Sequence, residues 1–282
     1  MRLNNLRFDN LFSAMKRYFL CILCTLCVSV HAQDTENYGA IWTEVGVSKA
    51  LPYNLSLDVD AGFRSIDWFN NANRFDIGVG LSYKLGKYLK FGLSYTFIER
   101  HFLSETKDHY TSAGDYDGYN VDAANWATRH RVSFDITADK RLWKTLRVFL
   151  RERYQYTHQA SRDIDRVKHR IQGTNLMTGE YVWDDPVDAI KHKSAWDRHL
   201  LRSRLKFSID RKGWDWEPFV SAELHNNMSD RWHIDKVRVA AGTEYSISKQ
   251  HKLSAAYIFN HENDDDGNEN IHAISIGYKF KF

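Results

Sequence analysis

The sequence predicts an all-β protein: an antiparallel transmembrane β-barrel of about 12 strands (10–12), preceded by a cleaved signal peptide. Three observations predict this fold. Apolar and polar residues alternate with a period of two in long runs, short and long connections alternate between the runs, and the chain ends in an aromatic strand. Aromatic residues make up 14% of the 282 residues, which argues against disorder. The mean hydropathy of −0.55 excludes a protein of many membrane helices, since each needs about 20 consecutive apolar residues.

The N-terminal segment, residues 1–32, has the pattern of a secretory signal peptide. Lys16 and Arg17 precede an apolar run over 18–30, and Ala32 ends a cleavage site of small residues. Met15 is an alternative start of translation, and if translation begins there, residues 1–14 are not part of the protein. The apolar run is too short for a transmembrane anchor. We therefore expect one mature domain, an outer-membrane β-barrel over residues 33–282.

Charge and cysteine content exclude several functions for the mature chain. The first 32 residues hold four of the 39 Lys and Arg, one of the 36 Asp and Glu, and all three cysteines. The remaining chain is therefore neutral and has no thiol. A neutral chain lacks the basic excess of a nucleic-acid-binding protein, so we expect no nucleic-acid partner. Disulfides and thiol chemistry are excluded as well.

Period-two alternation places apolar side chains on one face of each expected strand. In the run 75–85, Phe75, Ile77 and Val79 share one face, whereas Asp76 and Gly78 share the other. These runs are longer than the strands of globular sheets and fit strands that cross a bilayer at a tilt. The expected strands are 37–49, 53–65, 73–85, 88–101, 124–140, 144–158, 197–211, 217–228, 232–248, 251–262 and 270–282.

The connections between these runs alternate in length. Outer-membrane barrels have short periplasmic turns and longer outside loops, which would place the end of the last strand in the periplasm. Bacterial single-chain barrels normally have an even number of strands. We therefore expect twelve strands rather than eleven, with either a short strand hidden in 33–38 or an unusual closure by the first strand. The short turns lie near 50–52, 86–87, 141–143, 212–216 and 249–250, and the long loops at 66–72, 102–123, 159–196, 229–231 and 263–269.

Aromatic residues gather at the strand ends, where membrane barrels carry two belts of amphipathic rings. The expected periplasmic belt contains Tyr53, Tyr88, Trp143, Trp214, Trp216 and Phe282. The expected outer belt contains Trp68, Phe69, Phe102, Trp126, Tyr156, Trp196 and Trp232.

The polar strand face carries full charges with Gly and Ser, which suits a wet or salt-bridged lumen, so we expect the apolar face to point outward. Glu223 should lie opposite Arg202 or Arg204, because buried Arg prefers carboxylate partners. The simplest interpretation is a salt-bridged lumen; the alternative is a basic wall that steers or holds anions. Glu152 and His130 fall on the outer face, unless a bulge shifts the register. The expected lumen charges are Arg129, Arg131, Arg151, Arg153, Arg202, Arg204, Lys206, Glu217, Glu223 and Glu244.

The last strand carries the most specific motif. Ser275, Gly277, Phe280 and Phe282 fit the polar-x-Gly-x-x-aromatic-x-aromatic pattern that barrel-assembly machinery recognises. Such a strand offers a continuous apolar face and an edge with which the machinery can pair. We expect the assembly machinery to be a partner of the chain.

Neither a catalytic pair nor a clear metal site is found in the sequence. His130 and Ser133 have opposite parity along a strand and so point to opposite faces, as do His272 and Ser275. We therefore expect no enzyme and no cofactor. The segment 263–269 is most simply a solvated loop, and its spacing matches a calcium loop only loosely. The weak candidate ligands for a divalent cation are Asp264, Asp266 and Glu269.

Taken together, the leader, Trp42, the Arg-x-Arg strands and the aromatic last strand resemble the domain-of-unknown-function family 2490, outer-membrane β-barrels of Bacteroidota; the Arg-x-Arg pairs are Arg151/Arg153 and Arg202/Arg204. The resemblance implies the outer membrane of a Gram-negative bacterium and brings no catalytic residues. We expect a non-enzymatic barrel, a narrow channel or envelope scaffold, in contact with outer-membrane lipid and lipopolysaccharide. The alternatives are a transport or binding barrel for a small anionic or lipidic ligand and, least favoured, an outer-membrane lipid hydrolase.

Overall fold

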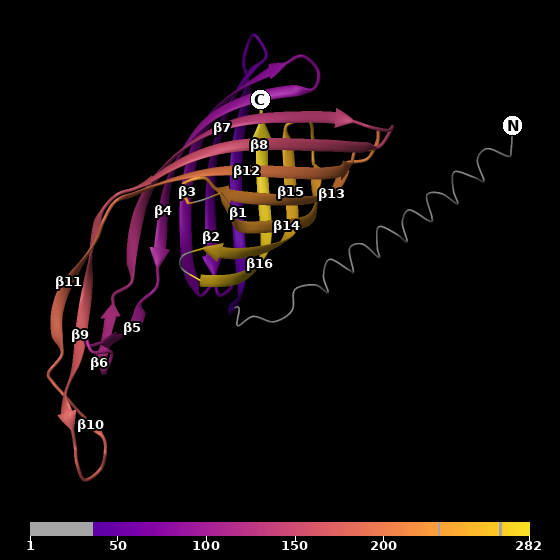
Figure 1. Cartoon of the computed structure of the whole chain (residues 1–282). Helices are drawn as coiled ribbons and strands as arrows, with labels where there is room; N and C mark the ends of the chain where they lie inside the picture. The colour runs from indigo at the N-terminus through magenta and orange to yellow at the C-terminus, as the bar shows by residue number, and fades with distance from the viewer. Residues whose placement is uncertain (1–35, 231, 265–266) are drawn as a thin grey trace, which may run out of the picture. The chain divides into compact units, whose positions relative to one another are not determined.

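The computed structural model describes residues 36–230, 232–264 and 267–282. Within these ranges the chain forms sixteen strands and no helix, and eleven of the strands close into a barrel (Figure 1). Among the described residues, no helix is long and apolar enough to cross a membrane. The expected signal peptide, residues 1–32, lies outside the described residues.

The barrel strands follow the period-two runs of the sequence. Each run alternates between two faces, which is the geometry of an extended strand with one apolar side. The strands are β1 (Glu36–Ala50), β2 (Leu55–Ile66), β3 (Asn71–Leu85), β4 (Leu89–Phe102), β7 (Asn125–Arg141), β8 (Leu146–Gln159), β12 (Trp196–Ile209), β13 (Trp216–Asn227), β14 (His233–Ser246), β15 (His251–Asp264) and β16 (Gly267–Lys281).

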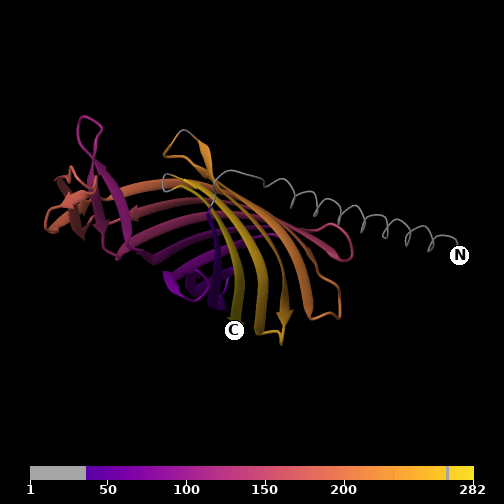
Figure 2. The same cartoon turned by 90° about the horizontal axis from the view of Figure 1, so that it is seen from below.

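The barrel closes through its first and last strands. β1 lies beside β16 (Figure 2), and the two strands run in the same direction, since the Ala50 N–H donates to the Phe282 carbonyl (3.1 Å) and the Phe282 N–H to the Ser48 carbonyl (3.0 Å). All ten other neighbouring pairs in the barrel are antiparallel. An odd number of alternating strands forces this one parallel pair. Eleven strands form the wall, which lies within the expected range of 10–12; the preferred number of twelve is wrong, and the alternative of an unusual closure by the first strand is confirmed.

The polarity of the wall is the reverse of that in a water-soluble protein, where large apolar side chains are buried. Ile77, Leu93 and Ile276 are each more than half exposed on the outer surface. Gln155 and Asn260, in contrast, are almost fully buried on the inside. The apolar face therefore points outward, as the sequence predicts.

The two longest connections are not loops, and the expectation of loops at 102–123 and 159–196 is wrong. They form a second sheet, here called the extension sheet, with strand order β10-β9-β6-β5 and with β11 also paired to β9. The strands of this segment do not alternate apolar and polar residues, so an apolar period does not reveal them; in β9, for example, the adjacent Asp165 and Arg166 place a charge on each face. The strands are β5 (Glu105–Tyr110), β6 (Tyr116–Asp122), β9 (Arg162–Thr174), β10 (Tyr181–Trp183) and β11 (Val187–Lys193).

The two ends of the barrel differ. At one end, here called the turn end, short connections join β1 to β2, β3 to β4 and β7 to β8, and β16 reaches the C-terminus. At the other, here called the loop end, the chain leaves the barrel for the extension sheet after β4 and β8. The six aromatic residues expected at the turn end are all exposed there.

Candidate functional site

Three cavities lie one after another in the lumen. The central cavity has a volume of about 690 Å³, the turn-end cavity about 510 Å³ and the loop-end cavity about 620 Å³. Neighbouring cavities share lining residues: Glu44 and Arg151 line the central and turn-end cavities, and Arg64 and Arg131 line the central and loop-end cavities. The lumen is therefore a continuous polar interior.

The structure places all ten of the expected lumen charges inside the barrel. Arg129 lines the loop-end cavity. The other nine line the central cavity: Arg131, Arg151, Arg153, Arg202, Arg204, Lys206, Glu217, Glu223 and Glu244. The alternation of the strands is sufficient to bring them together, because every second side chain of a barrel strand points inward.

Glu223 is the centre of the largest charge cluster. Its register partner across the β12–β13 pair is Arg204, and it is 3% exposed. The Nε of Arg202 donates to Glu223 Oε1 at 3.0 Å, and the Nε2 of His225 lies 2.7 Å from the same oxygen. One carboxylate thus serves four guanidinium groups, which leaves the cluster positive. The remaining ion-pair distances to Glu223 are 3.3 Å from Arg151, 3.9 Å from Arg204 and 3.7 Å from Arg238.

Towards the turn end, cations and carboxylates balance. Glu244 bridges Lys206 and Lys252, and Lys252 also lies 3.3 Å from Glu217. Five cations and five carboxylates line the turn-end cavity within the described ranges. This half of the lumen is a salt-bridged network, in agreement with the simplest interpretation of the sequence.

Towards the loop end, cations are in excess. Among the described residues, nine Arg and Lys line the loop-end cavity against three Asp and Glu. Arg129 donates to Gln159 (2.7 Å) and Arg131 to Thr157 (3.1 Å), which are both neutral acceptors. In the part of the chain that the structure describes, the four arginines of this cavity with no carboxylate within 4 Å are Arg64, Arg100, Arg129 and Arg131.

Aromatic rings support these arginines, and two of the rings were expected elsewhere. Phe102 and Trp196 line the loop-end cavity and therefore do not belong to the outer belt. The guanidinium of Arg129 lies over the Trp196 ring at 5.0 Å, and that of Arg64 over the Trp42 ring at 4.4 Å. Strand parity could have identified both inward rings: Phe102 shares the parity of Arg100, and Trp196 that of the other inward residues of β12.

The outer face carries polar residues that are paired with one another. Glu152 and His130 lie there as expected, and neither β7 nor β8 contains a bulge that would shift the register between them. Glu152 accepts a hydrogen bond from Ser203 at 2.6 Å. Tyrosine hydroxyls pair with histidine Nδ1 atoms across the strands at Tyr95–His130 (2.7 Å), Tyr154–His199 (2.7 Å) and Tyr257–His272 (2.6 Å).

The C-terminal motif divides between the two faces of β16. Ser275 and Gly277 line the lumen, whereas Phe280 and Phe282 stack on each other at 5.6 Å. A side chain at position 277 would collide with the hydroxyl of Ser254. The glycine therefore has a packing role, whatever role the motif has in assembly.

In the described ranges, no group of three or more His, Cys, Asp or Glu side chains could hold a metal ion. The weak candidate site falls outside what the structure describes, because Asp266 and the side chain of Asp264 are not among the described residues. Glu269 lines the loop-end cavity.

Outside the barrel, the best-defined charge site is in the extension sheet. Asp122 is 5% exposed and accepts hydrogen bonds from Arg166 Nε (2.5 Å) and Lys191 Nζ (2.5 Å). Burial alone would raise the pKa of the Asp122 carboxyl, but these two cations hold that pKa at about 2.

A closed barrel with an apolar outer surface and a charged lumen is the class of protein that the fold defines. The chain matches the model of the family "Protein of unknown function (DUF2490)" over residues 39–271, and it belongs to this family, as the sequence predicts. Among solved structures, it is similar to the translocator domain of the autotransporter NalP from Neisseria meningitidis, with 10% identity and a TM-score of 0.48 over 81% of this chain and 80% of that chain. No curated protein matches the sequence.

Proposed function

We propose that the protein is an outer-membrane β-barrel whose lumen is a narrow, anion-selective channel. The observation that carries the proposal is the excess of cations over carboxylates along the lumen, in the central and loop-end cavities of a barrel whose outer wall is apolar. Eleven Arg and Lys line the central cavity against seven Asp and Glu among the described residues. A wall with this charge attracts anions and repels cations, and the low-dielectric barrel strengthens both effects.

The outer surface supports a membrane location. Lipid tails offer no hydrogen bonds, so a polar side chain on a lipid-facing wall needs a partner within the protein. The Tyr–His pairs and the Glu152–Ser203 pair of the outer face meet this requirement. The exposed rings at the turn end also have the position that aromatic belts take at a membrane boundary.

The test is a conductance measurement on the full chain, folded and inserted into a planar bilayer. Under a KCl gradient, the reversal potential should have the sign of chloride selectivity. Reversing two lumen charges, Arg64→Glu with Arg131→Glu, should weaken or invert that selectivity. The control replaces a neutral pair, Arg153→Gln with Asp135→Asn, and should leave the sign unchanged, because Arg153 and Asp135 neutralise each other. A cation-selective current from the unmodified barrel would overturn the proposal.

A second candidate is an envelope scaffold with a blocked lumen. The Glu223 cluster favours it, since arginines from β8, β12 and β14 converge on one carboxylate inside the barrel. Folded barrels that insert but pass no current would support the scaffold against the channel.

We propose that the barrel has no catalytic activity and is inserted by the barrel-assembly machinery through β16. In the described part of the chain, no serine hydroxyl hydrogen-bonds a histidine ring, and an outer-membrane lipid hydrolase with a serine nucleophile would need such a pair. The contacts of the outer wall would then be with outer-membrane lipid and, at the loop end, lipopolysaccharide. Replacing Phe280 and Phe282 with Ala should reduce the amount of heat-modifiable, folded protein in the outer-membrane fraction.

A further inference from the structure

Three arginines surround the ring of Phe102 where the barrel meets the extension sheet. The guanidinium carbons of Arg100, Arg129 and Arg162 lie 5.1, 5.7 and 4.8 Å from the ring centroid. They come from β4, β7 and β9, so the topology brings together three segments that are distant in the sequence. Because they share one ring, the three charges lie within about one Debye length of one another, about 10 Å at 0.1 M salt.

The described residues form no ion pair with these three arginines. None of the three has a carboxylate within 4 Å in the described ranges, and their side-chain acceptors are neutral: Arg129 donates to Gln159 and Arg162 to Asn125 (2.8 Å). The Nε of Arg100 and the Nη1 of Arg162 are buried without a hydrogen-bond partner. A buried donor without a partner destabilises a fold, and a charged one does so more strongly. An anion between these groups would remove that penalty.

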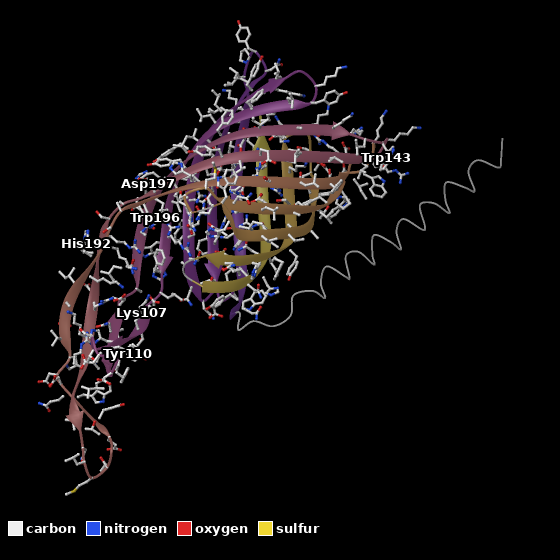
Figure 3. The ribbon with its side chains drawn as sticks, viewed as in Figure 1. Lys107, Tyr110, Trp143, His192, Trp196 and Asp197 are labelled. Carbon is white, nitrogen blue, oxygen red and sulfur yellow. The ribbon has the colours of Figure 1, made fainter. Side chains whose placement is uncertain are left out.

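The rings also fix how the donors can be used. The N–H groups of a guanidinium lie in its own plane. When its face lies against an aromatic ring, these N–H groups stay available to bind carboxylate or phosphate oxygens in a bidentate manner. Arg100 and Arg129 line the loop-end cavity together with Arg64 and Arg131. Trp196, at the start of β12, lies near the junction of the barrel with the extension sheet (Figure 3), and the Arg129 guanidinium lies over its ring.

We infer that the loop-end cavity is a binding site for a small polyanion that carries two or more phosphate or carboxylate groups. The cavity volume of about 620 Å³ lies within the range of small-molecule sites and is far more than a chloride ion needs. Several guanidiniums spread around one cavity match several oxyanion groups on one ligand. The inference rests on the proposed function, in which anions pass through the lumen; this site would be the entrance of that path.

The experiment measures binding rather than conductance. The full chain, folded in a neutral detergent, is titrated with inorganic tripolyphosphate and, separately, with citrate, by calorimetry and by tryptophan fluorescence. Saturable binding of at least one probe near one-to-one stoichiometry is expected, together with a fluorescence change, because Trp42 and Trp196 lie in the site. The two probes distinguish phosphate from carboxylate ligands. Affinity should fall as KCl is raised, and chloride alone should give no saturable signal.

The variant Arg100→Gln with Arg129→Gln and Arg162→Gln should weaken binding at least about tenfold. The control, Arg153→Gln with Asp135→Asn, removes an ion pair of no net charge that does not line the loop-end cavity. The affinity of this variant for the probes should equal that of the unmodified barrel. Heat-modifiable migration on gels shows that each variant is folded. Lack of saturable binding of both probes to the folded barrel would overturn the inference, and so would equal weakening by the control. An anion-selective current without probe binding would reject this site alone, whereas probe binding without current would reject the channel alone.

Discussion

The N–H of Phe282 donates a hydrogen bond to the carbonyl of Ser48 at 3.0 Å, and this bond joins the end of the chain to the first barrel strand in parallel. The ten other strand pairs of the barrel are antiparallel, so the β1–β16 seam differs from the rest of the wall. Parallel pairs are slightly less stable per residue than antiparallel ones. The position of Phe282 between Ser48 and Ala50 also fixes the register at this seam.

A cysteine cross-link across the seam should form in one register only. Lys49 and Phe282 lie side by side on the outer face, with the Lys49 ammonium 5.2 Å from the centre of the Phe282 ring. We expect Lys49→Cys with Phe282→Cys to form a disulfide on oxidation and to raise the thermal unfolding temperature, because the cross-link closes almost the whole barrel. Gel mobility with and without reductant reads out the bond.

The control for this cross-link is Lys49→Cys with Tyr278→Cys. Position 278 is four residues from 282, a displacement of about 13 Å along the strand, which a disulfide cannot span. If the control pair cross-linked as readily as the pair at 49 and 282, β1 and β16 would not have the register described.

Much of the barrel can be predicted from the sequence because the side-chain period of a strand is a local property. The runs around Phe75 and Leu253 show their alternation directly, and the structure contains a strand at each. Strand number and closure are global properties, and the parity argument that favoured a twelfth strand fails where β1 and β16 pair in parallel. The extension strands were missed for another reason: β9 alternates Asp165 with Arg166, so both of its faces are polar at that point.

The candidate site was predicted in part, for a related reason. Charges that recur on one strand, such as Arg202 and Arg204, stand out in the sequence, and the structure places them in the lumen. Single inward charges such as Arg64 and Arg100 carry the same parity signal but have no charge of the same sign two positions away to emphasise it. Phe102 was assigned to the outer belt because aromatic residues near a strand end suggest a membrane boundary, whereas its parity points inward.

Replacing Glu223 with Gln should destabilise the barrel strongly. The change leaves Arg202, Arg151 and their neighbours around an uncharged amide, and the loss of one partner from a buried ion pair typically destabilises a protein by about 3–5 kcal/mol. Urea unfolding of the detergent-folded protein, followed by tryptophan fluorescence, measures the effect. The matched control is Glu152→Gln on the outer face, which keeps an oxygen that can accept from Ser203. We expect a loss of about 1 kcal/mol or less for this control. Equal losses at the two positions would contradict the central place given to Glu223.

The extension sheet should lose stability in acid through Asp122. Its pKa of about 2 in the folded sheet is below the ordinary value of 3.8, so the carboxylate form is the one that folding stabilises. The stabilisation is fully present above about pH 4 and is lost as the pH falls through about 2. Its size is about 1–2 kcal/mol, because the shift corresponds to roughly 2 kcal/mol and water screens part of it in a thin sheet.

Pepsin, which is active throughout this pH range, can measure that change as cleavage within residues 105–193. Asp122→Asn removes the charge, so the variant sheet should be cleaved about 5 to 30 times faster than the unmodified sheet at pH 4. The ratio should approach one at pH 2, where Asp122 is half protonated or more. The exposed Asp188 on β11 provides the control, and Asp188→Asn should keep the acid response of the unmodified chain. A ratio for Asp122→Asn that stays constant from pH 4 to pH 2 would show that the two cations do not hold the Asp122 carboxylate as the structure describes.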